Sequence, residues 1–374
     1  MSIIKEIHKL RNDAALTIDL KNNNRYRVVT LENDGSKTAY YFSVPIYNSK
    51  TRKIIDREFC TDRGNIYLLG SNATISIAEN IIMQNSEGQC IVSLDSNITS
   101  TSQNEIFCGD KHLYPTTNGI CIKSDCSNGK PYTFSVEISK PFLNVRSNEK
   151  CLALMSERFR PFVTISCIGT SDSDGNIIST SILKYQKISD RKYTINIYPS
   201  SALGKHLLIE LNLYEPKLFQ DTTVESKNPK TNNAFGSTAF IGTTKDFGEE
   251  WLYTRPDFSK MIELNDKKII QASMHLPILN STTIEFVAST VSARFCSFGS
   301  NWNNKISEKE NLPNIKTTSH YIHLDLMPIF SETNGRFSKS EGFILKPKKR
   351  NLGFSVIPTG DSCFKPQILE INYK

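Results

Sequence analysis

The sequence predicts an all-β protein in which two tandem antiparallel β-sandwich domains of jelly-roll type follow a short N-terminal amphipathic helix. From residue 15 onward, short segments alternate hydrophobic and polar residues with a period of two and are rich in β-branched and aromatic residues. Turn-forming residues separate the segments at roughly 8–12-residue intervals without an intervening helical pattern, which favours a sandwich over an α/β fold. A chain of 374 residues, 38% of them hydrophobic, can bury a core in each domain.

The helix is predicted within residues 1–14. Ile3, Ile4, Ile7 and Leu10 recur at helical spacing with polar residues between them. Because so short a helix is marginal alone, we expect it to pack on the body of the protein or on a neighbouring subunit.

Residues 15–214 form the first predicted sandwich domain. Its period-two segments lie at residues 26–31, 40–47, 66–69, 73–77, 132–138, 162–167, 177–184, 192–197 and 206–214. Residues 95–130 have a poorer pattern and are expected to form long loops with one strand near residues 119–122. Residues 172–176 resemble a fragment of a calcium loop, but their glycine comes too early and the terminal glutamate is missing, so they predict a hairpin turn.

A short linker at 215–218 is expected next, because Pro216 cannot continue a central strand. Residues 219–374 then form the second domain. Eight short strands, which fit a jelly-roll sandwich, are predicted at residues 239–242, 251–255, 268–279, 283–288, 320–326, 342–345, 354–357 and 367–373.

Charge and hydropathy limit the partners. The net charge of +7 could attract an anionic partner such as nucleic acid or an acidic polysaccharide. The basic residues are spread along the chain, however, and the one dense run, 346–350, is typical of a solvated loop or an edge strand. We therefore predict no nucleic-acid partner. No apolar run approaches the ~20 residues needed to cross a bilayer, so no membrane span is predicted.

The nine cysteines include no CxxC pair, which leaves thioredoxin-like chemistry and common zinc ribbons without support. Most are expected to be small buried side chains. One or two disulfides in the first half are the alternative, with Cys121 and Cys126 as the closest pair.

Catalytic signatures are also missing: there is no GxSxG, no HExxH, no P-loop and no GxGxxG before a helix. The adjacent Glu249 and Glu250 would face opposite sides of a strand and could not flank one glycosidic bond. His323 and Asp325 would share a face while His320 points away, which favours a structural hydrogen bond over a metal site. We predict no catalytic residues, no cofactor and no metal.

Several short motifs occur in order across the second domain. They are Asp221, Asn228-Pro-Lys-Thr-Asn232, Gly236-Ser237, Ile241-Gly242, the segment 251–257, the strand 268–276, Asn301-Trp-Asn-Asn304, the strand 323–326 and the closing segment 364–370. In this order they resemble the DNRLRE domain, a β-sandwich of bacterial surface and polysaccharide-handling proteins that is also known as a carbohydrate-binding module. Two positions depart from that family: Trp251 replaces an arginine and Pro256 an aromatic residue, so this strand is expected at an edge or bulge.

Trp251, Tyr253 and Arg255 stand at i, i+2 and i+4 and would share one strand face. Flat aromatic rings and an arginine suit a sugar that carries a carboxylate, and Trp302 would supply a second aromatic ring. The alternative is that Trp251 and Tyr253 point inward as core residues.

The resemblance implies a non-catalytic surface or extracellular protein that binds a polysaccharide or cell-surface glycan. Residues 1–15 lack the apolar stretch of a secretory signal, so this location requires a removed signal or another export route. The alternative is a self-associating structural subunit of a phage tail, injection device or surface assembly, in which the amphipathic start docks onto a neighbour. A polysaccharide-degrading enzyme would need a cleft with two convergent carboxylates.

Overall fold

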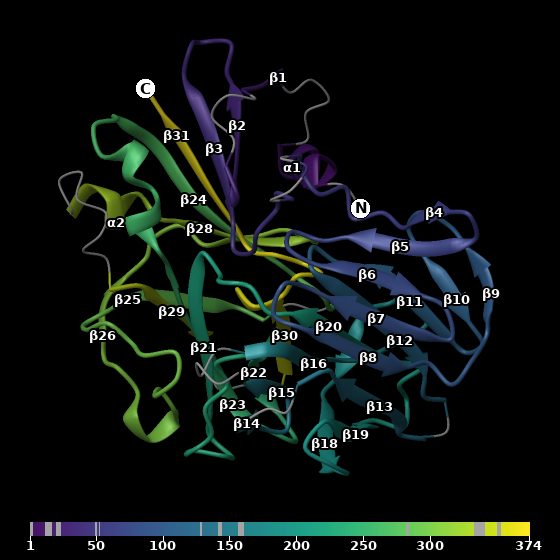
Figure 1. The fold of residues 1–374 in the computed structure, drawn as a ribbon. Coiled ribbons are helices and arrows are strands. Elements are labelled where there is room, and N and C mark those ends of the chain that lie inside the picture. The colour runs from purple at the N-terminus through teal and green to yellow at the C-terminus, as the bar shows by residue number, and fades with distance from the viewer. Residues whose placement is uncertain are drawn as a thin grey trace. The chain divides into compact units, whose positions relative to one another are not determined.

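The computed structural model describes residues 3–11, 17–19, 24–48, 51, 53–127, 129–140, 144–155, 161–281, 284–332, 341–349 and 353–374. The predicted all-β class is confirmed: antiparallel strands make up most of the structure, and the helices are short (Figure 1). The chain divides into two compact units. Unit 1 comprises Met1–Lys5 and Tyr47–Glu215, and unit 2 comprises Glu6–Ile46 and Pro216–Lys374. No helix in the described ranges is long and apolar enough to cross a membrane.

Unit 1 contains two antiparallel sheets. In spatial order, the β20 sheet contains β14 (Asn144–Ser147), β15 (Cys151–Met155), β16 (Pro161–Ser171), β20 (His206–Leu213), β12 (Gly119–Asp125), β11 (Lys111–Pro115), β10 (Ile106–Cys108) and β9 (Ile98–Thr101), with β17 (Ile177–Ser179) paired to β16. The β13 sheet contains β18 (Ser181–Lys187), β19 (Lys192–Pro199), β13 (Tyr132–Ile138), β8 (Gln89–Ser93), β7 (Asn80–Gln84), β6 (Thr74–Ile77), β5 (Asn65–Leu69) and β4 (Cys60–Asp62). One hydrophobic core joins both sheets, so unit 1 is a sandwich.

Within residues 95–130, the strand predicted near 119–122 is confirmed as β12, but the prediction of long loops before it is wrong, because β9, β10 and β11 lie there. β9 is an edge strand with largely exposed threonine and serine side chains, and β10 has three residues. Neither shows the hydrophobic alternation by which strands are recognised. The turn predicted at 172–176 is confirmed: the Asp172 carboxylate accepts hydrogen bonds from the backbone N–H groups of Asp174 and Asn176 at 3.0 and 2.9 Å.

Unit 2 also contains two sheets. The β31 sheet runs β1 (Thr17–Ile18), β2 (Arg27–Leu31), β3 (Lys37–Phe42), β31 (Ile368–Tyr373), β24 (Ile269–Pro277), β28 (Tyr321–Asp325) and β27 (Lys316–Thr317). The β23 sheet runs β26 (Glu308–Asn311), β25 (Phe286–Val291), β29 (Phe343–Pro347), β23 (Gly248–Pro256), β22 (Thr238–Thr244) and β30 (Gly353–Pro358), with β21 (Phe219–Glu225) paired to β23. Short helices are α2 (Met327–Glu332), η2 (Phe258–Lys260), η3 (Ile262–Leu264) and η4 (Trp302–Asn304). A second core joins these two sheets.

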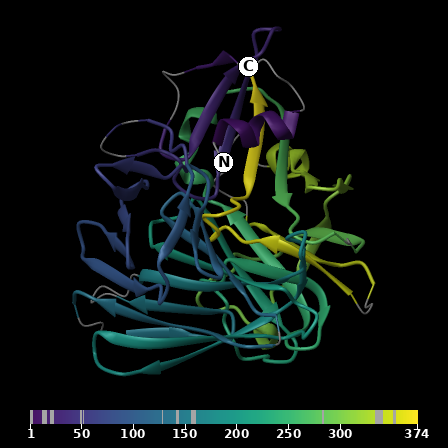
Figure 2. The same cartoon turned by 90° about the vertical axis from the view of Figure 1, so that its right-hand side faces the viewer.

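The expected domain boundaries require a correction. The structure changes unit between Glu215 and Pro216, inside the predicted linker, but β1 to β3 belong to unit 2 and not to a first domain of 15–214. The C-terminal strand β31 lies between β3 and β24 (Figure 2). Val29, Ala39 and Tyr41 pack in the core of unit 2. Unit 2 is therefore discontinuous, because strand pairing, which local periodicity does not report, recruits the N-terminal hairpin.

The predicted amphipathic helix is confirmed as α1 (Ile3–Arg11); residues 1–2 and 12–14 of the prediction lie outside the described ranges. Its second half packs on the body of unit 2. The Arg11 guanidinium donates two hydrogen bonds of 2.8 Å to the Glu32 carboxylate just after β2. The hydroxyl of Tyr321 on β28 donates to the Glu6 carboxylate at 3.2 Å.

All nine cysteines lie within the described ranges, and none of them is joined in a disulfide. Cys60 and Cys296 are exposed and the other seven are buried. The prediction that most cysteines are small buried side chains is therefore confirmed, and the alternative of one or two disulfides is wrong. The strand with Pro256 also differs from expectation. β23 is interior, between β21 on one side and β22 and β29 on the other, and Pro256 is its last residue.

Candidate functional site

The two tryptophans of the chain lie against each other on unit 2. Trp251 comes from β23 and Trp302 from η4, and their ring centroids are 4.9 Å apart with the planes tilted by 53°. Both rings are half-buried. A capping box holds η4, because Asn301 accepts from the Asn303 N–H at 3.0 Å while the Asn304 side chain accepts from the Asn301 N–H at 2.6 Å.

The Asn-Pro motif also positions this loop. The Asn232 amide donates to the carbonyl oxygens of Ser297 and Ser300 at 2.6 and 2.8 Å, and the Asn303 N–H donates to the Pro229 carbonyl at 3.2 Å. Two motifs that are distant in the sequence therefore hold Trp302 in place.

Charged groups surround the two indoles. The Lys305 ammonium lies 3.6 Å from the Trp302 ring centroid and 5.0 Å from that of Trp251, and Lys346 lies 5.4 Å from Trp251. The indole N–H of Trp251 donates to Glu249 at 2.8 Å. The cation–π contacts and the hydrogen bond to Glu249 group five side chains together. We call this group, Trp251, Trp302, Lys305, Lys346 and Glu249, the tryptophan surface.

Tyr253 and Arg255 do not contribute to an exposed face, contrary to the expectation from their spacing. Tyr253 is 1% exposed, and its hydroxyl donates to the Ile306 carbonyl at 3.1 Å. Arg255 is 5% exposed, and burial lowers its pKa, as does the nearby Arg294. The alternative that Tyr253 points inward as a core residue is therefore correct. It belongs, however, to a smaller hydrophobic cluster that is separate from the core that contains Leu252.

That cluster contains Val224, Tyr253, Val291, Phe295 and Ile344, and both tryptophans pack on it. It forms a hydrophobic support beneath the tryptophan surface. Sequence reasoning identified the tryptophans but missed Lys305 and Lys346, because loop packing brings Lys305 to the rings and the pairing of β29 brings Lys346 there.

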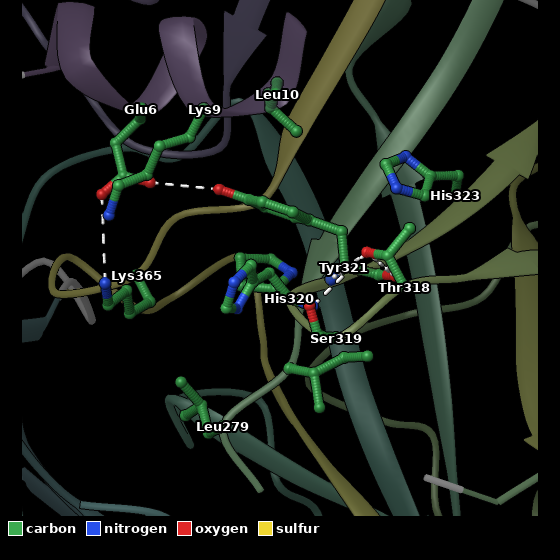
Figure 3. Close-up of a pocket in the computed structure, with 12 residues that line it drawn as sticks. Glu6, Lys9, Leu10, Leu279, Thr318, Ser319, His320, Tyr321, His323 and Lys365 are labelled. Carbon is green, nitrogen blue, oxygen red and sulfur yellow. Dashed lines mark hydrogen bonds and ion pairs between the residues drawn. The ribbon is translucent and has the colours of Figure 1, made fainter. Parts of the chain in front are cut away.

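Two neighbouring pockets lie along the β31 sheet of unit 2. The first, of about 660 Å³, lies between the second half of α1 and the segment leading into β28, with Glu6, Lys365, His320 and Tyr321 in its wall (Figure 3). The second, of about 700 Å³, is lined by residues of β24, β27 and β28 and the loops beside them. Thr318 and His323 line both pockets.

His323 belongs to a chain of part-buried hydrogen bonds with His275 and Glu370. Its Nδ1 lies 2.7 Å from Nδ1 of His275, and Nε2 of His275 lies 2.7 Å from a Glu370 carboxylate oxygen. Burial lowers the pKa of His323 to about 4, and the His275 and Lys316 side chains act in the same direction. His323 is therefore neutral at physiological pH.

The partner of His323 is thus His275 and not Asp325, which accepts from the backbone N–H of Met327 at 3.0 Å. His320 is exposed in the first pocket. Among the described residues, no group of three or more histidine, cysteine, aspartate or glutamate side chains could hold a metal ion. His275 and Glu370 carried no local signal, because only the strand register brings them to His323.

The fold and these surfaces define an all-β protein with an aromatic, charged surface and a pair of polar pockets on one sandwich unit. No protein-family model matches the chain, and no curated protein matches it in sequence.

Proposed function

We propose that this chain is a non-catalytic glycan-binding protein that acts at the cell surface or outside the cell and binds its ligand at the tryptophan surface of unit 2. The observation that carries the proposal is the contact between Trp251 and Trp302 with Lys305 beside both rings. Indole faces stack on sugar rings, and adjacent charged groups bind the hydroxyl or acidic substituents.

Charge favours an acidic glycan. Lys305 and Lys346 both lie over indole rings, and the chain carries a net charge of +7. Lys346 also pairs with Glu308, so Lys305 is the cation to which we assign the ligand's acidic group. A carboxylate on the ligand would replace the ring face as the partner of Lys305 and leave the indole open for stacking. The resemblance of residues 219–374 to DNRLRE modules supports the same ligand class.

Intrinsic fluorescence tests the proposal, because the chain has two tryptophans and both belong to this surface. Oligomers of a uronic-acid glycan and of a neutral glucan are titrated into the full chain. We expect the acidic oligomer to change the emission saturably and the neutral oligomer to bind more weakly. Failure of both to change the emission, with no heat of binding in calorimetry, would contradict the proposal.

A matched pair of variants assigns the site. Lys305→Ala should weaken binding of the acidic oligomer at least about tenfold, the loss expected for one charge-assisted hydrogen bond. Lys184→Ala is the control, since its ammonium lies 5.4 Å from the Tyr198 ring centroid on unit 1 and makes the same kind of contact. Equal weakening by both variants would show only a non-specific charge effect.

A structural subunit is the second candidate. The observation that favours it is the exposed edge of unit 1, where Tyr185, Ile188 and Tyr198 are 38%, 54% and 39% exposed beside the edge strand β18. Light scattering after size exclusion tests it: Tyr185→Lys should reduce the mass of a self-associated form, whereas a monomer at all concentrations would remove this candidate.

A further inference from the structure

We infer that the two pockets that share His323 form a second binding site, which takes a neutral, hydroxyl-rich small ligand such as a monosaccharide. This inference goes beyond the tryptophan surface. No tryptophan lines either pocket, and the pockets lie on the β31 sheet and not on the β23 sheet. Their volumes fall within the range of roughly 300–1,000 Å³ that is usual for small-molecule sites.

The hydrogen-bond chain gives His323 a defined role. The Glu370 carboxylate can only accept, so we assign the proton between these two residues to Nε2 of His275. Nδ1 of His275 then accepts from Nδ1–H of His323. The remaining nitrogen of His323, Nε2, carries a lone pair. It is therefore an oriented acceptor, suited to a ligand hydroxyl.

The surroundings keep this acceptor neutral. His275 on β24, Glu370 on β31 and Lys316 on β27 are the titratable groups that act on His323, and burial is the largest influence on its pKa. Burial, His275 and Lys316 oppose protonation of His323, while Glu370 favours it. Nε2 therefore accepts hydrogen bonds over the whole physiological range of pH.

The pocket walls favour a ligand without net charge. In the second pocket the cation Lys316 is accompanied by the anion Asp325, and Asn314, Ser273 and Gln271 add neutral donors and acceptors. In the first pocket the Glu6 carboxylate lies 4.0 Å from the Lys365 ammonium, and Lys9 also lines the pocket. A charged ligand would meet both signs, whereas hydroxyl groups can donate to one and accept from the other.

Two other uses of these residues fit less well. Two nitrogens that bind one tetrahedral metal at about 2.0–2.1 Å lie about 3.3 Å apart, whereas the two Nδ1 atoms are 2.7 Å apart, which is a hydrogen-bond distance. Covalent catalysis would need a nucleophilic side chain activated by His323. The Thr318 hydroxyl, which lines both pockets, donates to the Tyr321 carbonyl at 3.1 Å within its own turn.

The test uses the full chain with nitrogen-15-labelled histidine and follows the imidazole resonances by NMR. Glucose, galactose and mannose are added separately, and glucuronate serves as the charged comparison. We expect at least one neutral sugar to shift the His323 resonances saturably and more strongly than glucuronate. No shift with any of the three sugars, or tighter binding of glucuronate, would overturn the inference.

Variants make the assignment specific. His323→Leu should weaken sugar binding at least about tenfold, and His323→Gln, which keeps an acceptor, should restore part of it. His112→Leu on unit 1 is the matched control, because His112 also contacts a carboxylate, that of Glu105, at 2.7 Å. Trp302→Ala should leave this binding unchanged. Loss of binding with Trp302→Ala alone would move the sugar to the tryptophan surface and refute a second site.

Discussion

The indole rings of Trp251 and Trp302 lie 4.9 Å apart although they come from separate elements, strand β23 and helix η4. Each ring covers part of the other, and both rest on the same hydrophobic cluster. The position of Trp251 in the tryptophan surface therefore depends on the η4 loop, which holds Trp302 against it.

Removal of one ring should therefore change both stability and fluorescence. Trp302→Ala exposes Trp251 to water, so the emission should shift to longer wavelength, and the free energy of unfolding should fall by about 1–2 kcal/mol, from the lost ring contact and some lost burial. Trp302→Phe retains a ring and should show smaller changes. An emission maximum unchanged by Trp302→Ala would contradict the packing described here.

The Arg11–Glu32 pair should anchor α1. Its two 2.8 Å hydrogen bonds are parallel, and the side chains are 23% and 19% exposed. A double-mutant cycle of Arg11→Ala and Glu32→Ala should give a coupling energy of about 1 kcal/mol. A coupling near zero, measured by urea unfolding, would mean that the helix is held by its apolar side alone.

This pair also predicts a dependence on pH. Burial acts to raise the pKa of Glu32, but hydrogen bonds from Arg11, Thr38 and Thr30 outweigh it and lower the pKa below 4.5. The stabilisation is therefore present above pH 4.5 and lost as the pH falls through the lowered value. The same cycle repeated in acid should yield a smaller coupling.

Gly119 should not tolerate a side chain. A Cβ at this position of β12 would overlap the Leu211 carbonyl oxygen on β20, which is backbone in the middle of a sheet and cannot move aside. Gly119→Ala should cost about 3 kcal/mol, measured by circular-dichroism melting. In Gly299→Ala the nearest atom would be the Cys296 sulfur at 3.6 Å, so the change should stay within about 0.5 kcal/mol. Similar melting of both variants would argue against this strand register.

Asp221 should be replaceable by asparagine with a gain in stability. Burial raises its pKa well above the usual range, and the neighbouring Asp361 raises it further. The folded state then holds a proton that the unfolded state has released, so stability falls as the pH rises above 3.8 towards the raised pKa. Asp221→Asn should therefore raise the melting temperature at neutral pH, because asparagine needs no proton uptake on folding.

The gain from Asp221→Asn should shrink as the pH falls towards 4, where the unfolded aspartate is also protonated. Asp190→Asn is the control, because Asp190 is exposed and Lys187 lowers its pKa. A stabilisation of equal size in both variants, followed by thermal melting against pH, would contradict a buried protonated carboxyl.

His323 should destabilise the fold in mild acid. Its pKa of about 4 lies below the ordinary 6.5, so between these values the unfolded state binds the extra proton. Stability should therefore be complete above pH 6.5 and fall by at most about 3 kcal/mol towards pH 4. His323→Leu should flatten the melting curve against pH in this window; an unchanged slope would mean that the imidazole is not desolvated.

Much of the fold could be predicted because it rests on local patterns. The eight strands expected in 219–374 match β22, β23, β24, β25, β28, β29, β30 and β31, whose buried residues alternate or form apolar runs. The spacing of Ile3, Ile7 and Leu10 predicted α1 for the same reason. In β9 most side chains are polar and exposed, so the alternation of hydrophobic and polar residues is absent, and this strand was not predicted.

The site could be predicted only in part. Tryptophan is rare in the chain, so both rings were found, but the equal spacing of Trp251, Tyr253 and Arg255 did not reveal that the last two are buried. The contact between His275 and His323 depends on the pairing of β24 with β28. No motif in the sequence records that register.

The sequence by itself determined the all-β class, the N-terminal helix and the position of most strands, because alternation and turn chemistry act between near neighbours. Only the tertiary structure decided that β3 pairs with β31, that the two tryptophans meet and which histidines are hydrogen-bonded. Those outcomes depend on strand register and loop packing between distant segments, where many pairings satisfy the same local pattern and only the joint burial of a core selects one.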